Sequence, residues 1–180
     1  MSVADPDAPA PRRILLYGAT GSGKTTAAQR IAERLGVPVI LADEIGWLPN
    51  WMQRPPEEQI ELIEHAIAGG EWVLDSAYSA WQHVVLPHVD LIVALDYPRW
   101  FSLQRLVRRT VRRVVSREEL FAGNRESWRL MLSRDSIIVW HFRSWRDKRQ
   151  TMRAWAADPD APPVLLVRRA RDMEKWIASL

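Results

Sequence analysis

The feature that most constrains the fold of this chain is a glycine-rich loop at residues 18–25, with the sequence GATGSGKT. The residues before it, ILLY at 14–17, are all apolar or aromatic, as in a buried parallel strand. After the loop, apolar residues recur at helical spacing as far as Gly36, a typical helix stop. This order of strand, glycine loop and helix predicts a binding site for nucleotide phosphates, because loop N–H groups and the positive end of the helix would face one anion.

Each residue type in this loop has a physical role in that prediction. Glycines allow the backbone to turn with its N–H groups pointing inward. Lys24 would reach the β- and γ-phosphates of ATP, and the hydroxyl group of Thr25 is placed to bind Mg²⁺. The residues that we expect to contact the nucleotide are Gly18, Ala19, Thr20, Gly21, Ser22, Gly23, Lys24, Thr25 and Thr26.

Four further apolar runs have the length of buried strands, and helical patterns separate them. The runs lie at residues 37–41, 72–74, 91–95 and 164–167. The clearest helical patterns lie at residues 56–67, 100–114, about 133–155 and 172–180, and the capping-box spacing of Ser116 and Glu119 predicts a further short helix there. Strands that alternate with helices predict an α/β fold: a parallel sheet with helices on both faces.

Acidic residues follow several of the predicted strands. Asp43, Asp75 and Asp96 all lie at such strand ends, where ligands bind in parallel sheets. A nucleotide-binding enzyme of this kind needs an acid beside the loop to hold Mg²⁺, directly or through water. Asp75 and Asp96 both fit that role by position, and either could instead cap a turn or helix.

Composition restricts the class of protein further. The chain has no cysteine, which excludes disulfides and thiolate metal sites and suits a reducing cytoplasm. Residues 1–11 have the composition of a loose tail rather than a signal peptide, and no apolar run approaches the ~18 residues of a membrane span. We therefore expect a cytoplasmic protein without a membrane partner, whose residues 12–180 form a single domain.

Positive charge is concentrated in one part of the chain. Residues 99–153 contain fourteen arginines and one lysine against five acids. Such a block favours a phosphate-rich partner such as a nucleotide, a nucleic acid or an anionic lipid surface, and guanidinium groups suit bidentate phosphate contacts. The alternative is a solvated helix face.

The motifs together resemble those of a known family. The glycine loop, WVLD at 72–75 and LDYP at 95–98, followed by Arg105 and Arg109, resemble the adenylate-kinase-like family of small P-loop kinases. The branch labelled topology modulation protein, or adenylate-kinase-related kinase, is similar in four further residues, Asp43, Trp47, Pro49 and Trp51. The resemblance extends from about residue 13 to the C-terminus.

This resemblance implies a three-layer fold with a five-stranded sheet in the order 2-3-1-4-5. It also implies a substrate-binding segment at 43–70 and an arginine-bearing lid at about 116–135. In that arrangement Asp75 would bind Mg²⁺, and Asp96 would be a structural turn residue. Arg105 and Arg109, which lie one turn apart on one helix face, would reach the transferring phosphate.

The acceptor segment departs from the family pattern. Nucleoside monophosphate kinases hold the acceptor phosphate with arginines in this segment, whereas here Arg54 is the single basic residue between Arg34 and Arg99. We therefore expect a smaller or less charged acceptor than AMP. Trp47, Trp51 and Tyr78 either line its pocket or belong to the core.

Asp43 and the histidines complete the candidate residues. Asp43 would either orient or deprotonate an acceptor hydroxyl group, or simply cap a helix. The histidines show no metal-binding spacing, and we interpret them as ordinary core or surface residues: His65, His83, His88 and His141.

The function predicted from these features is Mg²⁺-dependent transfer of the γ-phosphoryl group of ATP to a small nucleotide-like or hydroxyl acceptor. The alternative is a nucleotide-binding regulator whose basic segment contacts nucleic acid. We favour the first, because the chain carries no recognisable nucleic-acid-binding motif.

Overall fold

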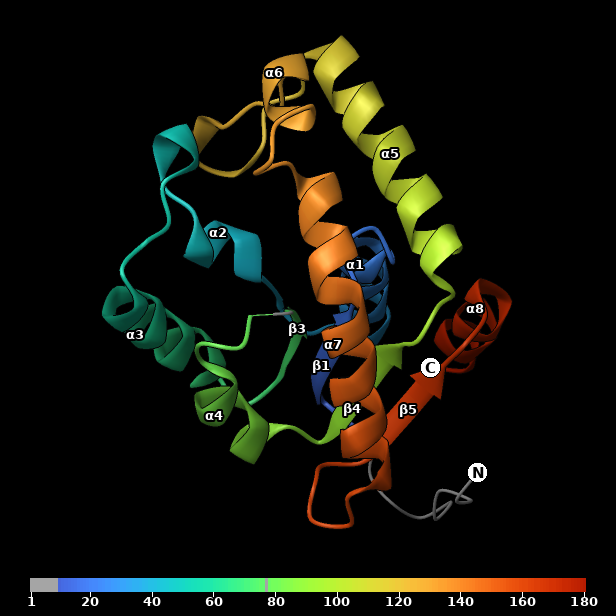
Figure 1. Cartoon of the computed structure of the whole chain (residues 1–180). Helices are drawn as coiled ribbons and strands as arrows, with labels where there is room; N and C mark the ends of the chain where they lie inside the picture. The colour runs from blue at the N-terminus through green and yellow to red at the C-terminus, as the bar shows by residue number, and fades with distance from the viewer. Residues whose placement is uncertain (1–9, 77) are drawn as a thin grey trace.

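A computed structural model of the protein describes residues 10–76 and 78–180, so residues 1–9 of the predicted tail lie outside the described part. All strand pairings are parallel, and the order is β2-β3-β1-β4-β5, which confirms the predicted fold class (Figure 1). The strands are β1 (Arg13–Gly18), β2 (Val39–Leu41), β3 (Trp72–Asp75), β4 (Leu91–Leu95) and β5 (Val164–Val167).

Helices cover both faces of this sheet and give three layers. On one face pack α1 (Lys24–Leu35) and α8 (Ala170–Ser179), and on the other α3 (Pro56–Ile67), α4 (Gln82–Val85) and α7 (Ile137–Ala157). Alternation along β1 explains the two cores, because Ile14 and Leu16 join the first whereas Leu15 and Tyr17 join the second.

The remaining helices lie beyond or between the core elements. They are α2 (Ala42–Gly46), η1 (Pro49–Trp51), η2 (Leu86–His88), α5 (Arg99–Ser116), η3 (Phe121–Gly123) and α6 (Trp128–Met131). In Figure 1, α5 extends away from the sheet, and α6 lies near its far end. No helix in the described part of the chain is long and apolar enough to cross a membrane.

The predicted capping box at Ser116 and Glu119 is wrong. Ser116 is the last residue of α5, and Arg117 follows it with a left-handed φ of 51°. The carboxylates that follow are used in ion pairs instead: Glu118 contacts Arg113 at 3.3 Å, and Glu119 contacts Arg125 at 3.1 Å. These pairs hold the connection after α5 in a non-helical conformation.

The long C-terminal helix begins later than the pattern predicts. α7 starts at Ile137, because Ser136 is its N-cap and accepts a hydrogen bond from the Val139 N–H at 3.2 Å. Its position on the sheet is fixed by Asp96 at the end of β4, whose side chain is only 1% exposed. Arg149 and Arg153 of α7 donate to the two oxygens of this carboxylate, at 2.7 and 3.0 Å.

We expect Asp96→Asn to destabilise the fold by about 2 kcal/mol, because a buried carboxylate with charge-assisted hydrogen bonds would be lost. Chemical denaturation monitored by circular dichroism measures this change. The matched control is Glu71→Gln, which removes the exposed ion pair with Arg12 and should leave the denaturation midpoint almost unchanged. Equal effects of the two substitutions would contradict the anchoring role of Asp96.

Candidate functional site

The glycine-rich loop adopts a conformation that requires glycine at two positions. Gly21 and Gly23 have left-handed φ values of 80° and 96°. A Cβ atom at Gly21 would lie 2.5 Å from the Ser102 carbonyl oxygen and 2.7 Å from the Leu106 Cβ, both on α5. Glycine is therefore required both for the turn and for the close packing of α5 against the loop.

The lysine of the loop lies within it. Lys24 Nζ donates to the carbonyl oxygens of Gly18 and Ala19, at 3.1 and 3.3 Å. Burial lowers the pKa of Lys24, although Asp75 and Asp43 favour its charged form. The ammonium group is therefore held within the loop by the loop's own carbonyl oxygens.

Asp75 is the acid that adjoins the loop. It ends β3, and its backbone lies in register with Leu16 of β1 and Leu41 of β2. The Thr25 hydroxyl group donates to Asp75 Oδ2 at 2.5 Å. Burial raises the pKa of Asp75, and Lys24 and the Thr25 hydrogen bond oppose that shift. The adjacent hydroxyl and carboxylate oxygens fit the ligand chemistry of Mg²⁺.

Of the two arginines predicted on α5, Arg105 contacts the loop and Arg109 lies within electrostatic range of Lys24. A Cβ atom at Gly23 would lie 2.9 Å from Arg105 Nη2, so the guanidinium group lies against the loop backbone. Arg109 is half-buried, and its Nε has no hydrogen-bond partner among the described residues. Burial lowers the pKa of Arg109, and the neighbouring Arg113 adds to this effect.

Asp43 does not cap α2. Leu41 occupies the N-cap position, and Asp43 lies in the first turn, so the helix-capping alternative is wrong. The Tyr78 hydroxyl group donates to Asp43 Oδ1 at 3.0 Å. Asp43 is solvent-exposed, and this hydrogen bond directs one oxygen while the other carries no protein hydrogen bond in the described part of the chain.

Tyr78 is in turn positioned by the core. Its ring stacks on Trp81, with centroids 5.6 Å apart and planes 10° from parallel. The Trp81 indole donates to Gln59 Oε1 of α3 at 3.1 Å, and Gln59 donates to the Arg54 carbonyl oxygen at 2.6 Å. Tyr78 therefore belongs to a continuous chain of contacts that joins the second core to Asp43.

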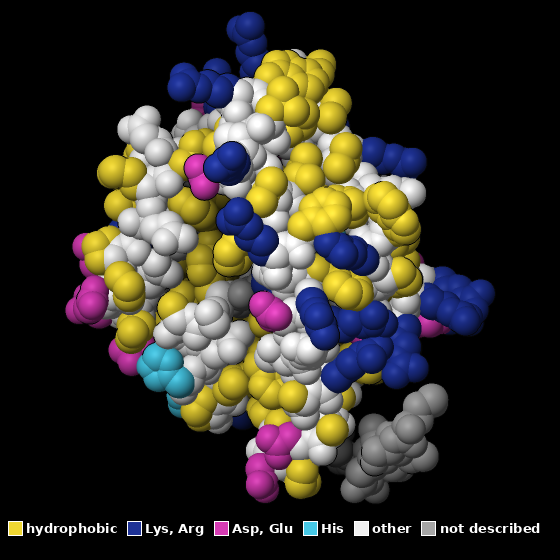
Figure 2. All heavy atoms as spheres, in the orientation of Figure 1, with side chains coloured by type: hydrophobic (Ala, Val, Ile, Leu, Met, Phe, Trp, Pro, Cys, Tyr) yellow, Lys and Arg dark blue, Asp and Glu magenta, His cyan; other side chains and the backbone are white. Residues whose placement is uncertain are grey.

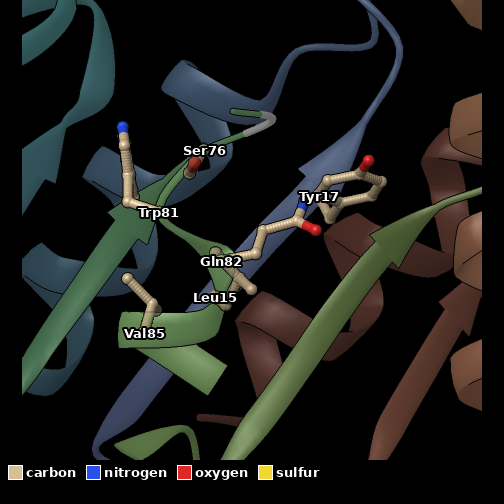
Figure 3. Close-up of a pocket in the computed structure, with 6 residues that line it drawn as sticks. All are labelled: Leu15, Tyr17, Ser76, Trp81, Gln82 and Val85. Carbon is tan, nitrogen blue, oxygen red and sulfur yellow. The ribbon is translucent and has the colours of Figure 1, made fainter. Parts of the chain in front are cut away.

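A small internal space lies beside this chain of contacts. Figure 3 shows its lining side chains, which come from β1 and from the segment that follows β3. They are Leu15, Tyr17, Ser76, Trp81, Gln82 and Val85. The space belongs to the interior between the sheet and α4, and it is separate from the glycine loop.

The predicted acceptor segment and the predicted lid are joined by a set of contacts that we call the latch, formed by residues 47–53 and 119–125. Asn124 Oδ1 accepts from the Trp51 N–H at 2.8 Å, and its amide nitrogen donates to the Leu48 carbonyl oxygen at 2.9 Å. The Trp51 ring meets both Trp47 and Phe121 edge-on, each at 5.8 Å. Trp51 thus packs between two segments of the protein.

Arg54 is already used within its own segment. Its Nε donates to the Ile45 carbonyl oxygen at 2.9 Å, and its Nη1 contacts Glu58 at 3.3 Å. These contacts use two of its three guanidinium nitrogens and hold the connection between α2 and α3.

Sequence analysis missed two buried residues of α7, and one of them contacts the glycine loop. His141 was interpreted as ordinary, but its Nδ1 lies 3.0 Å from the Thr20 carbonyl oxygen of the loop, and its side chain is fully buried. Lys148, which is 9% exposed, lies on the same helix face. The 3- and 4-residue spacing of His141, Ser144 and Lys148 could have predicted that they share one helix face. The aromatic residues around the helix obscured this pattern.

Comparisons with known proteins support this description of the fold. The isopentenyl transferase family model matches residues 11–51, which include the glycine loop. No curated protein matches the sequence. A gluconokinase from Sinorhizobium meliloti 1021 is similar in structure, with 16% sequence identity, 94% of this chain and 93% of that chain covered, and a TM-score of 0.53.

A second solved structure, deoxyadenosine kinase from M. mycoides, is also similar. It has 14% sequence identity, with 92% of this chain and 95% of that chain covered and a TM-score of 0.52, and it contains dCMP and a flexible dCDP as products. The chain therefore has a three-layer α/β fold similar to that of these two kinases, with the glycine-rich loop directly after β1.

We expect Asn124→Ala to open the latch from both sides, because Asn124 is buried and bridges the two segments with its amide group. Hydrogen–deuterium exchange should become faster in residues 47–53 and in residues 119–125, with unchanged protection in β1. The control, Met52→Ala, alters an exposed side chain of the same segment and should leave residues 119–125 protected. Faster exchange on one side alone would contradict the bridging role.

Proposed function

We propose that the protein transfers the γ-phosphoryl group of ATP, with Mg²⁺, to a hydroxyl group of a small acceptor that lies against Asp43. The observation that carries the proposal is the meeting of donor and acceptor groups at one edge of the sheet. The pair formed by Thr25 and Asp75 adjoins Lys24, and Asp43 is close enough to Lys24 and to Arg109 to shift the pKa of both. The proposal includes membership of the adenylate-kinase-like group, in its topology modulation branch.

On the donor side, each residue acts mainly through charge and position. Loop N–H groups and Lys24 would hold the β- and γ-phosphates, and Thr25 with Asp75 would hold Mg²⁺, which neutralises phosphate charge when bound. Arg105 and Arg109 add positive charge where the transferring group develops negative charge. Both structural neighbours are named as kinases, which supports phosphoryl transfer over nucleotide binding alone.

On the acceptor side, the structure favours a hydroxyl group over a phosphate. Asp43 is held by Tyr78, which leaves an oxygen free to accept a hydrogen bond from an acceptor hydroxyl and to orient or deprotonate it. Arg54, the single basic residue of residues 43–70, is held by Ile45 and Glu58. An acceptor without a phosphate at that end therefore fits this segment best.

The internal use of the arginines supports this function over the nucleic-acid alternative. Arg149 and Arg153 bind Asp96, and Arg113 and Arg125 pair with glutamates of the segment after α5. On the face shown in Figure 2, basic side chains lie in separate groups between hydrophobic ones rather than in one continuous stripe. Much of the basic block thus stabilises the fold or faces the loop.

The donor and acceptor roles are tested separately by two substitutions. Lys24→Ala should abolish ATP binding and turnover, because the phosphates lose their main cation. Asp43→Asn should keep ATP binding and reduce kcat with the true acceptor by on the order of 10²- to 10⁴-fold, the usual contribution of an acid–base group. Calorimetric binding and coupled ADP-release assays measure both effects.

Glu44→Gln is the matched control for Asp43, since Glu44 is an exposed acid at the next position. It should keep full kcat. Undiminished turnover in folded Lys24→Ala would overturn the donor assignment, and equal rates in Asp43→Asn and the wild type would overturn the acceptor assignment alone.

We expect AMP to be a poor acceptor compared with hydroxyl compounds that lack a phosphate, because residues 43–70 contain one arginine, Arg54, and it is already engaged with Ile45 and Glu58. ADP release with AMP and with a panel of nucleosides, sugars and sugar acids measures this preference. AMP turnover of about 10 per second, a typical enzyme rate, would contradict it. DNA-stimulated hydrolysis together with tight, salt-dependent DNA binding would favour the regulator instead.

A further inference from the structure

The buried face of α7 brings a second lysine to the phosphate site. His141, Ser144 and Lys148 are all buried, and their spacing places them on one side of the helix. Because His141 contacts the Thr20 carbonyl oxygen at 3.0 Å, this side of α7 is in contact with the glycine loop. Lys148 lies about two turns further along the same side.

Lys148 has no acidic partner in the described part of the chain. No carboxylate there lies within 4.0 Å of its ammonium group, and its nearest recorded interaction is with the Trp140 ring, 6.0 Å from Nζ to the centroid. The next residue, Arg149, shows the contrast, because it is paired with Asp96. An unpaired buried cation is costly for a fold, and such groups normally coordinate or pair with something.

The charged groups that face Lys148 come from three elements of the site. Lys24 of α1 repels it, whereas Asp43 of α2 and Asp75 of β3 attract it. Burial is the largest effect, and with the repulsion of Lys24 it lowers the pKa of Lys148 to about 7. The side chain therefore lies within electrostatic range of the donor lysine and of the acceptor carboxylate.

We propose that Lys148 is a phosphate-binding residue that contacts the transferring phosphoryl group between the glycine loop and Asp43. This inference rests on the proposed function. The role is that of a cation, because the negative charge of a bound triphosphate favours the protonated ammonium form. Lys24 would then contact the phosphates from α1, and Arg105 and Arg109 would contact them from α5. Lys148 would add a cation from a third helix, α7.

Proton uptake gives a test that a purely structural lysine would not pass. A group with a pKa of about 7 is about 90% neutral at pH 8, so it must take up close to one proton when a bound anion makes it charged. We would titrate the protein with a non-hydrolysable ATP analogue in EDTA at pH 8, in two buffers with different ionisation enthalpies. The wild type and Lys148→Met should differ by most of one proton per ligand bound.

Affinity and turnover distinguish the role further. Lys148→Met should weaken binding of the analogue about 10-fold or more and reduce kcat on the order of 10²-fold, as for loss of one charge-stabilising donor. Lys148→Arg should restore most of the affinity without proton uptake, because a guanidinium group is charged throughout. Arg146→Met, which alters an exposed residue of the same helix, is the control and should match the wild type.

Three results would overturn the inference. The first is that folded Lys148→Met keeps wild-type affinity and proton uptake. The second is that proton uptake persists in Lys148→Arg. This second result applies even if Lys148→Met does not fold. The third is a kcat that rises through pH 7 in the wild type but not in Lys148→Met, since that result would assign a base. Lys24→Met separates the two proposals: if it abolishes binding while Lys148→Met keeps wild-type affinity and proton uptake, only the role of Lys148 fails.

Discussion

The close approach of α5 to the glycine loop at Gly21 determines where the arginines of the site can lie. No side chain fits at this position, because the Ser102 carbonyl oxygen and Leu106 occupy the space. The helix axis therefore passes directly beside the loop, and Arg105 reaches Gly23. Arg109, one turn further along, lies within range of Asp43 and Asp75. The backbone contact at Gly21 thus determines the positions of the Arg105 and Arg109 guanidinium groups, which belong to a helix and not to a strand of the sheet.

The acceptor side depends on packing in the second core, at some distance from the loop. Asp43 is exposed, so burial does not fix the position of its carboxylate. One hydrogen bond from the Tyr78 hydroxyl group orients it instead. Tyr78 rests on Trp81, which Gln59 holds from α3. Since rotamers packed in a core vary little, this series of contacts gives an exposed carboxylate a defined position. The latch adds a second constraint, because it joins the acceptor segment to the segment that follows α5.

Local patterns made the fold and the donor site predictable, whereas contacts between distant segments did not. The apolar strands and the glycine loop have short-range signals, and family resemblance supplied their order in the sheet. Asn124 acts through contacts with residues more than 70 positions away, which no local pattern predicts. The spacing of Lys148 on α7 was obscured, because aromatic and basic residues lie on most sides of that helix. The prediction of a capping box at Ser116 was wrong. Glu118 and Glu119 form ion pairs with arginines instead, and helix propensity does not predict such pairs.

The balance of charge at the edge of the sheet shows how these parts combine. Lys24, Arg109 and Lys148 have lowered pKa values because they are buried, and Lys148 is additionally repelled by Lys24. Asp75 has a raised pKa for the same reason of burial. Each of these shifts disfavours the charged form that phosphoryl transfer would use. The proposed triphosphate and divalent cation would oppose these shifts: the phosphate oxygens would favour the charged cations, and the metal would favour the carboxylate. The proposed metal–nucleotide complex therefore suits the charges at this edge of the sheet.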